Sequence, residues 1–171
     1  MTTTITGSGG VSQVQDGSIG TADFAANAIT AAKLPAGSVL QVVHNNFNTH
    51  TTSSSGTYAD TGLQMSITPT SSSSKILVLV SQCGVRKEGG DAYMYLKLVR
   101  NSTDLVQISI TSAYTGSNTL NSGSESTCFL DSPNTTSSVG YKTQFFRGNV
   151  GNVHVQVNGV KSTITLMEIA G

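Results

Sequence analysis

The sequence predicts an all-β protein, with a jelly-roll-like β-sandwich head that follows a short repeat stem and assembles with further copies of itself. Three observations lead to this prediction. From residue 37 onward, apolar residues alternate with polar residues over many short runs, as they do in half-buried strands. Clusters rich in Gly, Ser, Asn and Asp separate these runs and are typical of turns. Before residue 37, large apolar residues recur at every fifth position, which is the period of neither a helix nor a strand.

Residues 1–13 are expected to form an extended anchoring arm. Glycines at positions 7, 9 and 10 make this segment pliable, and it has neither a helical nor a strand period. Such a segment suits an arm that becomes ordered when it docks onto another protein.

Residues 14–36 are predicted to form a stem. The five-residue period of the stem, which the first strand of the head continues, consists of Val14, Ile19, Phe24, Ile29, Leu34 and Val39. Five residues turn an α-helix about 140° away from its starting face, and an odd step along a strand reverses the face. One copy therefore cannot bury these residues against itself, and identical copies wound around each other would supply the missing surfaces. The alternative is an Ala-rich linker with an accidental period.

The stem holds two copies of a ten-residue unit, SIGTADFAAN and AITAAKLPAG. Thr21 and Thr30 can each cap a helical turn, since a hydroxyl oxygen there accepts hydrogen bonds from free backbone amides. Helices this short need packing partners in water. Two units are fewer than a self-supporting solenoid requires, so a collar or short stem is expected rather than a long shaft.

Residues 37–171 are predicted to form the head, whose eight or nine short strands favour a jelly-roll sandwich. The predicted strands are Ser38–Val43, Gly62–Thr68, Lys75–Cys83, Ala92–Arg100, Leu105–Thr111, Glu125–Leu130, Val139–Arg147, Asn152–Val157 and Ser162–Ile169. Asn158–Gly159 predicts a hairpin turn between the last two strands, because both residues tolerate a positive φ. The apolar phase changes between Leu166 and Met167, which predicts a bulge or a change of strand partner.

The run from Ile76 to Val80 is apolar on both faces, so the outer face of this strand is also expected to be covered. A subunit interface would provide that cover, and its candidate residues are Leu77, Leu79, Tyr93, Tyr95 and Tyr141. The alternative is a central strand with loops over its outer face.

The composition argues against several classes of partner. Charged residues make up 11% of the chain, and nine basic residues balance nine acidic ones, so neither nucleic acid nor an anionic membrane is expected. No run of about 18 apolar residues could span a membrane, and MTTTITGSGG lacks the basic-then-apolar order of a secretory signal. Ser, Thr, Asn and Gly instead give the neutral, hydrogen-bonding surface that is common among extracellular and virion proteins.

The sequence contains no catalytic or cofactor-binding pattern. His44 and His50 could meet Asp60 at a metal ion, but their spacing matches no local ligand pattern. The abundant serines form no nucleophile elbow, and no paired carboxylates suit a glycosidase. Cys83 and Cys128 are expected to be buried thiols that act as small apolar side chains, with a disulfide between them as the alternative.

The stretch DGSIGTADFAANAITAAKLPAGSVLQVV resembles a segment of tailed-bacteriophage fibre proteins, in which short Ala/Thr/Ile-rich repeats end in an AAKL-like sequence and lead into a C-terminal β-domain. The continuation TYADTGLQMSITPTSSSSKILVLVS and the terminal ITLMEIA resemble the β-domains of such virion proteins. The resemblance implies a homotrimer and a virion location, and it transfers no functional residue. The short arm and stem depart from the pattern of full tail fibres and favour a short fibre, a distal piece or a capsid spike.

The expected function is that of a non-enzymatic virion structural protein, a short trimeric fibre or spike held on the capsid or tail by residues 1–13. Two alternatives stay open: a receptor-binding tip that recognises a host-surface glycan, and a capsid decoration or cement protein. Phe47, Tyr58 and Tyr114 are the expected glycan contacts in loops, because the chain has no Trp. The small size and the lack of paired carboxylates disfavour a polysaccharide depolymerase. No cofactor is expected.

Overall fold

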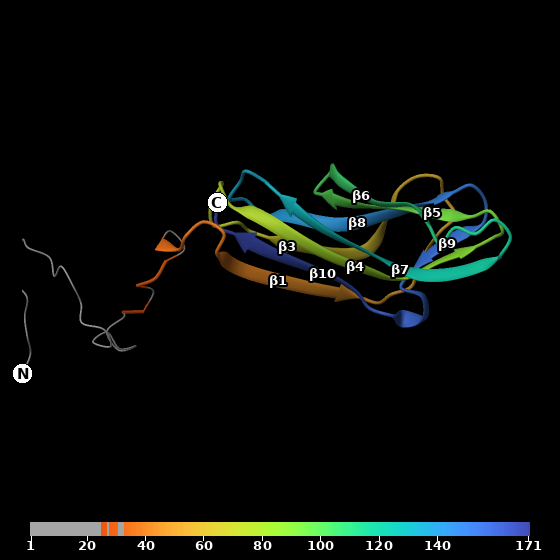
Figure 1. Ribbon diagram of the computed structural model, residues 1–171, viewed down its shortest axis with the longest axis horizontal. Helices are drawn as coiled ribbons and strands as arrows, with labels where there is room; N and C mark the ends of the chain where they lie inside the picture. The colour runs from red at the N-terminus through yellow and green to blue at the C-terminus, as the bar shows by residue number, and fades with distance from the viewer. Residues whose placement is uncertain (1–24, 27, 31–32) are drawn as a thin grey trace, which may run out of the picture.

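The computed structural model describes residues 25–26, 28–30 and 33–171, and two β-sheets packed face to face make up its head (Figure 1). The strands are β1 (Val39–Phe47), β2 (Thr51–Ser53), β3 (Ala59–Ile67), β4 (Lys75–Glu88), β5 (Tyr93–Arg100), β6 (Thr103–Ser112), β7 (Leu120–Asp131), β8 (Val139–Gly148), β9 (Asn152–Val155) and β10 (Ser162–Ile169). A 3₁₀ turn, η3 (Val157–Gly159), connects β9 to β10. The prediction of an all-β sandwich is confirmed.

The strand pairing is nested along the chain. β1 pairs with β10, β2 with β9, β3 with β8, β4 with β7 and β5 with β6, and every pair is antiparallel. The smaller sheet has the order β3-β8-β5-β6. In the larger sheet, β7 flanks one edge of β4, and β10 and then β9 share the other edge. The order of the larger sheet is therefore β1-β10-β4-β7 at one end and β2-β9-β4-β7 at the other.

Alternation along the strands places aliphatic side chains between the sheets, in two clusters. One cluster includes Ile76 and Val78 of β4 and Leu166 of β10, packed against the inner face of the smaller sheet. The other lies further along the sandwich and includes Met94 of β5 and Phe145 of β8. These side chains are fully buried, so the hydrophobic effect holds the two sheets together.

A buried polar network crosses the sandwich between the two apolar clusters. Thr143 Oγ1 donates to Gln82 Oε1 at 2.9 Å, and Gln82 Nε2 donates to Ser162 Oγ at 3.0 Å. The hydroxyl oxygens of Thr61 and Thr143 lie 2.5 Å apart. Buried polar groups need such partners, because they have lost their hydrogen bonds to water. Gln82 and Ser162 belong to the larger sheet and both threonines to the smaller one, so the network also ties the sheets together.

The turn at Asn158–Gly159 differs from the predicted hairpin. Both residues have the expected positive φ, 59° for Asn158 and 72° for Gly159. However, β9 and β10 do not pair with each other across this turn, because β9 pairs with residues 86–88 of β4 and β10 with residues 75–81. The turn therefore moves the chain along one edge of β4, and the hairpin prediction is wrong.

The apolar phase of β10 changes because Glu168, a charged residue, occupies the core-facing position that follows Leu166. β10 keeps one register with β4 across Leu166 and Met167, so the predicted bulge or change of partner does not occur there. Glu168 is fully buried and accepts hydrogen bonds from Gln41 Nε2 at 2.6 Å, Thr70 N at 2.7 Å and Thr70 Oγ1 at 2.8 Å. Burial alone would raise the pKa of Glu168, but these hydrogen bonds outweigh it and lower the pKa below its ordinary value.

Several strands differ in extent from the prediction, since β1 continues to Phe47 instead of ending at Val43 and β7 begins at Leu120 instead of Glu125. β4 continues past Cys83 to Glu88, and its register with β7 shifts between Gln82 and Val85, where Gly84 adopts a φ of 61°. This bulge lets β4 continue where the predicted strand ended. β2 was not predicted, because a strand of three residues is too short to establish a period.

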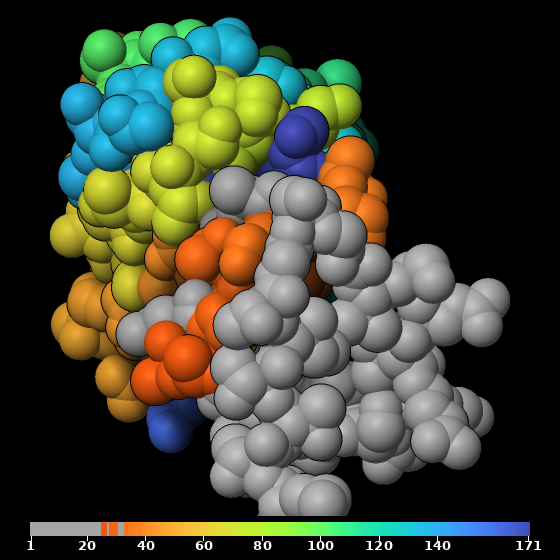
Figure 2. All heavy atoms as spheres, turned by 90° about the vertical axis from the view of Figure 1, so that its left-hand side faces the viewer, coloured from red at the N-terminus to blue at the C-terminus, as the bar shows by residue number. Residues whose placement is uncertain are grey.

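The stem joins the head beside the C-terminal residues, at the left-hand end of the sandwich in Figure 1. Gly37 N donates to Ala170 O, and Ala170 N donates to Ser38 O, each at 2.8 Å. Figure 2 looks onto this end of the head with the described stem residues, in orange, in front of it, and Figure 1 shows these residues leading away from the sandwich. The predicted stem contacts outside the described residues are Val14, Ile19 and Phe24.

Candidate functional site

The outer face of the larger sheet carries a row of aliphatic side chains, which we call the aliphatic row. The register places Val42 opposite Met167, Met167 opposite Leu77, and Leu77 opposite Leu130, so the row crosses β1, β10, β4 and β7. Val42 is 53% exposed and Leu130 is 50% exposed, while the two central side chains are half-buried. Single exposed apolar residues are ordinary on proteins, but a contiguous row is typical of a surface that another molecule covers.

Apolar side chains also lie on both sides of the aliphatic row. Leu79 pairs with Cys128 in the next row, and Val39 pairs with Ile169 in the preceding one. Among the described residues of these three rows, Lys75 is the one Asp, Glu, Lys or Arg. An exposed surface with this little charge has the composition of the central part of a protein interface.

The described members of the five-residue period leave apolar surface in water. Ile29 is 60% exposed, and Leu34 and Val39 are also exposed. Val39 begins β1 and lies on the outer face of the larger sheet. Val39 therefore belongs both to the five-residue period of the stem and to the apolar outer face of the head.

The other residues predicted for a subunit interface lie in three different places. Leu77 and Leu79 are on the outer face of the larger sheet, as the pattern of β4 indicated. Tyr93 and Tyr95 are partly exposed on the outer face of the smaller sheet, on the opposite side of the head. Tyr141 has no exposed surface, because it lies on the inner face of β8. It cannot contact a partner chain, and its prediction as an interface residue is wrong.

Tyr141 instead completes a partly buried ion-pair cluster. Its hydroxyl donates to Asp131 Oδ2 at 2.7 Å, and Arg100 Nη1 lies 2.8 Å and 2.7 Å from the two oxygens of the same carboxylate. Burial, and then the hydrogen bond to Asp131 and the negative charge of that carboxylate, raise the pKa of Tyr141, so its hydroxyl stays protonated. Asp131 belongs to β7 and the other two residues to the smaller sheet, so this cluster also joins the sheets.

Both cysteines, which lie within the described residues, are free thiols. Cys83 is half-buried and Cys128 is exposed. The alternative of a disulfide between them is therefore wrong, and so is the prediction that both thiols are buried. Cys128 lies beside the aliphatic row, opposite Leu79.

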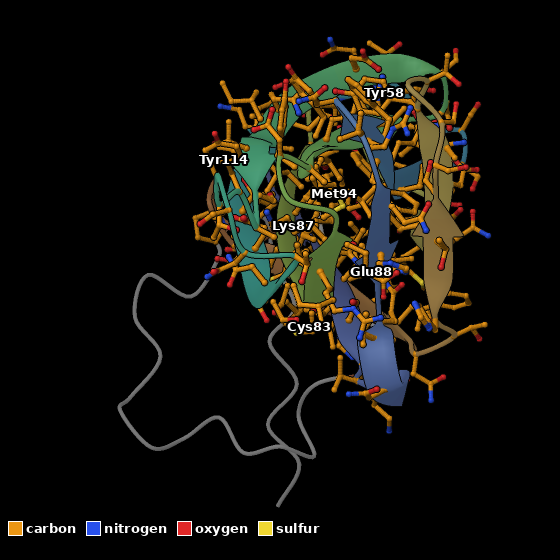
Figure 3. All side chains as sticks on the ribbon, turned by 90° about the vertical axis from the view of Figure 1, so that its right-hand side faces the viewer. Tyr58, Cys83, Lys87, Glu88, Met94 and Tyr114 are labelled. Carbon is orange, nitrogen blue, oxygen red and sulfur yellow. The ribbon has the colours of Figure 1, made fainter. Side chains whose placement is uncertain are left out.

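The outer face of the smaller sheet carries a line of aromatic rings, which we call the aromatic strip. The strip consists, in order, of Tyr58, Phe146, Tyr95, Tyr93 and Tyr114, with successive ring centroids 4.6, 4.3, 5.6 and 6.0 Å apart. Phe146 and Tyr95 stack with 5° between their planes, and the two end rings meet their neighbours at 80° and 82°. Figure 3 shows both end rings toward the outside of the sandwich and Met94 in its interior.

Small and polar residues fix the rings of the strip. Gly148 lies opposite Tyr93, and a Cβ at this position would collide with the tyrosine ring that covers it. Lys97 Nζ lies 3.8 Å from the centroid of the Tyr58 ring, which is the geometry of a cation–π contact. The hydroxyl of Tyr58 donates to Gln107 Oε1 at 2.8 Å. The strip is therefore ordered within the single chain.

The strip contains two of the three predicted glycan contacts, Tyr58 and Tyr114. The third, Phe47, ends β1 and packs against the core and over Gly62, so it is not a loop contact. Phe146 was missed by the sequence reasoning. A signal was available, because two adjacent phenylalanines in a strand point to opposite faces, so the neighbour of a core phenylalanine must face outward.

The histidines do not form the metal site considered from the sequence. His50 Nε2 lies 3.1 Å from His154 Nδ1, and Thr52 Oγ1 lies 2.9 Å from the same nitrogen. His44 and Asp60 have other partners. Among the residues that the structure describes, no group of three or more His, Cys, Asp or Glu could hold a metal ion. Burial lowers the pKa of His154 below its ordinary value.

Comparison with known protein families and with curated proteins finds no match to this chain. Within the described part of the chain, no helix is both long enough and apolar enough to cross a membrane.

Proposed function

We propose that this chain is a non-enzymatic virion structural protein that forms a short trimeric fibre or spike. In this proposal, residues 1–13 anchor the trimer on a capsid or tail, the three stems wind around each other, and the sandwich forms the displayed head. The resemblance of the stem and the β-domain to tailed-bacteriophage fibre proteins supports the virion location.

The nested strand pairing supports a jelly-roll head. A jelly roll is a long antiparallel hairpin rolled up so that its strands fall into two sheets. The pairs of this chain run from β1 with β10 to β5 with β6, and the two main orders are β1-β10-β4-β7 and β3-β8-β5-β6. β2 and β9 add one short pair to the larger sheet.

One observation carries the trimer proposal: the exposed apolar residues of the five-residue period continue from the stem onto the apolar outer face of the larger sheet. Ile29 and Leu34 are exposed before the head, and Val39 continues the period onto the outer face beside the aliphatic row. Removing apolar surface from water contributes about 25 cal/mol per Å² to association, from which the entropy lost on association is subtracted. Because the surface is nearly free of charge and no other part of the described chain covers it, further copies of the chain are its proposed cover.

Light scattering of the full chain tests this proposal, and the expected mass is about three times 17.7 kDa. Val42→Ser combined with Leu130→Ser should shift the protein toward monomer, and so should Phe24→Ser combined with Ile29→Ser, while the head stays folded. Ile110→Ser is the matched control, since Ile110 is 56% exposed on β6 of the other sheet, and its mass should not change. A monomeric wild-type chain would contradict the proposal, as would equal dissociation of the control.

A further inference from the structure

We infer that the aromatic strip is a binding site for a neutral oligosaccharide. This inference goes beyond the proposed assembly role and does not depend on it, because all five rings belong to one chain. Four of the five tyrosines in the sequence, Tyr58, Tyr93, Tyr95 and Tyr114, lie in the strip, and Tyr141 lies in the core. The chain thus concentrates its phenolic rings on one outer face of the head.

The chemistry of the strip matches that of a saccharide. A sugar ring has faces lined by C–H groups, which pack against flat aromatic rings, and hydroxyls at its periphery that need hydrogen-bonding partners. Tyrosine meets both needs, since it presents a rigid apolar ring and a polar tip at low conformational-entropy cost. The pKa of Tyr93 is raised, chiefly by the neighbouring Tyr95, and that of Tyr114 is raised by Asp91. These hydroxyls therefore remain protonated, and able to donate hydrogen bonds, at neutral pH.

The rings are held in place before any ligand binds. Phe146 and Tyr95 are cross-strand partners with stacked rings, so each restricts the rotation of the other. At one end of the strip, the fully buried Lys87 donates from Nζ to Gly90 O at 2.6 Å and to Thr115 O at 2.5 Å. These bonds tie β4 to the loop that carries Tyr114. Such pre-organisation lowers the entropy that binding must overcome.

Charge balance around the strip selects a neutral saccharide. Lys97 lies beneath Tyr58 and forms an ion pair with Asp104 at 2.7 Å. Further along the same face, Lys142 forms an ion pair with Asp60 at 2.9 Å. An acidic glycan would require an unpaired cation, and the positive charge of each of these lysines is already matched by a carboxylate. The strip therefore offers rings and hydroxyls beside lysines that are already paired, and the carboxylate of Asp91 next to Tyr114 adds a negative charge that would repel an acidic glycan.

The strip and the aliphatic row are on opposite outer faces of the sandwich. A trimer that buries the row between its copies would leave the strip of each head facing outward. The two surfaces also differ in character, because the row is aliphatic and lacks hydrogen-bonding tips, whereas the strip carries four phenolic hydroxyls. The aliphatic surface suits a second copy of the chain, and the hydroxyl-bearing surface suits a sugar.

A glycan array of neutral and acidic oligosaccharides, probed with the full chain, tests the inference. The neutral glycan with the strongest signal is then titrated by calorimetry against the variants. We expect Phe146→Ala and Tyr114→Ala each to weaken its affinity about tenfold or more, since aromatic residues dominate binding energies. Val160→Ala is the control, because Val160 is an exposed aliphatic residue after η3, and it should bind as the wild type does. Tyr114 is itself exposed in a loop, so Tyr114→Ala is a variant whose fold should be intact.

Three outcomes would overturn the inference: no binding to any neutral glycan, binding to acidic glycans alone, or binding that survives removal of the rings. Tyrosine fluorescence gives a second readout, since the chain has no Trp, and the bound neutral glycan should change the emission of the wild type. Light scattering of the same samples separates the two proposals. A monomer that binds the glycan contradicts only the assembly role, and a trimer that binds none contradicts only the saccharide site.

Discussion

At the residue scale, Glu168 links the stability of the head to pH. Its pKa is lowered because hydrogen bonds from Gln41 and Thr70 outweigh the effect of burial. The stabilisation is complete above the ordinary pKa of 4.5 and is lost as the pH falls through the lower folded-state pKa, because the unfolded chain binds the proton first. We expect Glu168→Gln to lose about 2 kcal/mol of unfolding free energy at pH 7. Its stability in urea should also depend less on pH between about 5 and 3 than that of the wild type.

Thr70→Ala provides the matched comparison for Glu168→Gln. It keeps the carboxylate and removes the hydroxyl donor that lies 2.8 Å from Glu168 Oε1. Its loss at pH 7 should be smaller, and its pH dependence should fall between those of the wild type and Glu168→Gln. If Glu168→Gln kept the pH dependence of the wild type, the carboxylate could not be the group that titrates.

Burial of single residues could be predicted where alternation was regular and not where polar side chains turned inward. Ile76 and Val78 follow the period of β4 and are core residues, as the sequence indicated. Glu168 and Tyr141 are also buried, but partners on other strands decide this, among them Gln41 for the first and Asp131 for the second. A single sequence does not reveal such pairings, so polar core positions had no signal.

At the element scale, Gly84 allows β4 to bulge and to pair with β10 before it and β9 after it. Its φ is 61°, and a Cβ there would lie 2.5 Å from Val157 N and 2.6 Å from Val160 Cγ2. Gly84→Ala should therefore push η3 away from β4 and lower the unfolding free energy by about 2 kcal/mol or more. The midpoint of urea unfolding, followed by far-UV circular dichroism, measures this loss.

Gly123→Ala is the control for the β4 bulge. Gly123 lies on β7 directly opposite Val85, and a Cβ there would meet nothing within 4 Å. Its unfolding free energy should stay within about 0.5 kcal/mol of the wild type. A Gly84→Ala protein as stable as this control would show that the bulge does not need a glycine.

Element identities could be predicted because alternation and turn clusters depend on neighbouring residues, but strand partners could not. Asn158–Gly159 has the backbone conformation expected of it, yet the turn carries the chain along the edge of β4 instead of closing a hairpin. The choice between these outcomes depends on which edge of the sheet is free, a property of the whole sandwich. The same reasoning applies to the aromatic strip, whose members Tyr58, Tyr95 and Tyr114 come together only through the pairing of β5 with β8 and the path of two loops.

At the scale of the whole molecule, the head has two unlike outer faces, and the proposed assembly assigns a different role to each. The aliphatic row would face the trimer axis in line with the stem, and the aromatic strip would face outward. In this arrangement the exposed thiol of Cys128, which lies opposite Leu79, becomes a reporter of the interface. It should be protected from reagents in the trimer and accessible in the monomer.

Thiol labelling measures this protection directly. The Cys83→Ser background leaves Cys128 as the one thiol of the chain. In this background, maleimide should label the trimer at least about tenfold more slowly than it labels a chain dissociated by Val42→Ser and Leu130→Ser. The reason is that a covered thiol reacts only when the interface opens transiently. Dilution of the trimer to a concentration at which it dissociates should restore fast labelling of Cys128 without a Val42 or Leu130 substitution. Dissociation by mass action uncovers the aliphatic row. Equal labelling rates for a trimer and its dissociated chain would mean that the copies associate through another surface. The row would then need a different cover, and the role of the stem in assembly would have to be tested apart from that of the head.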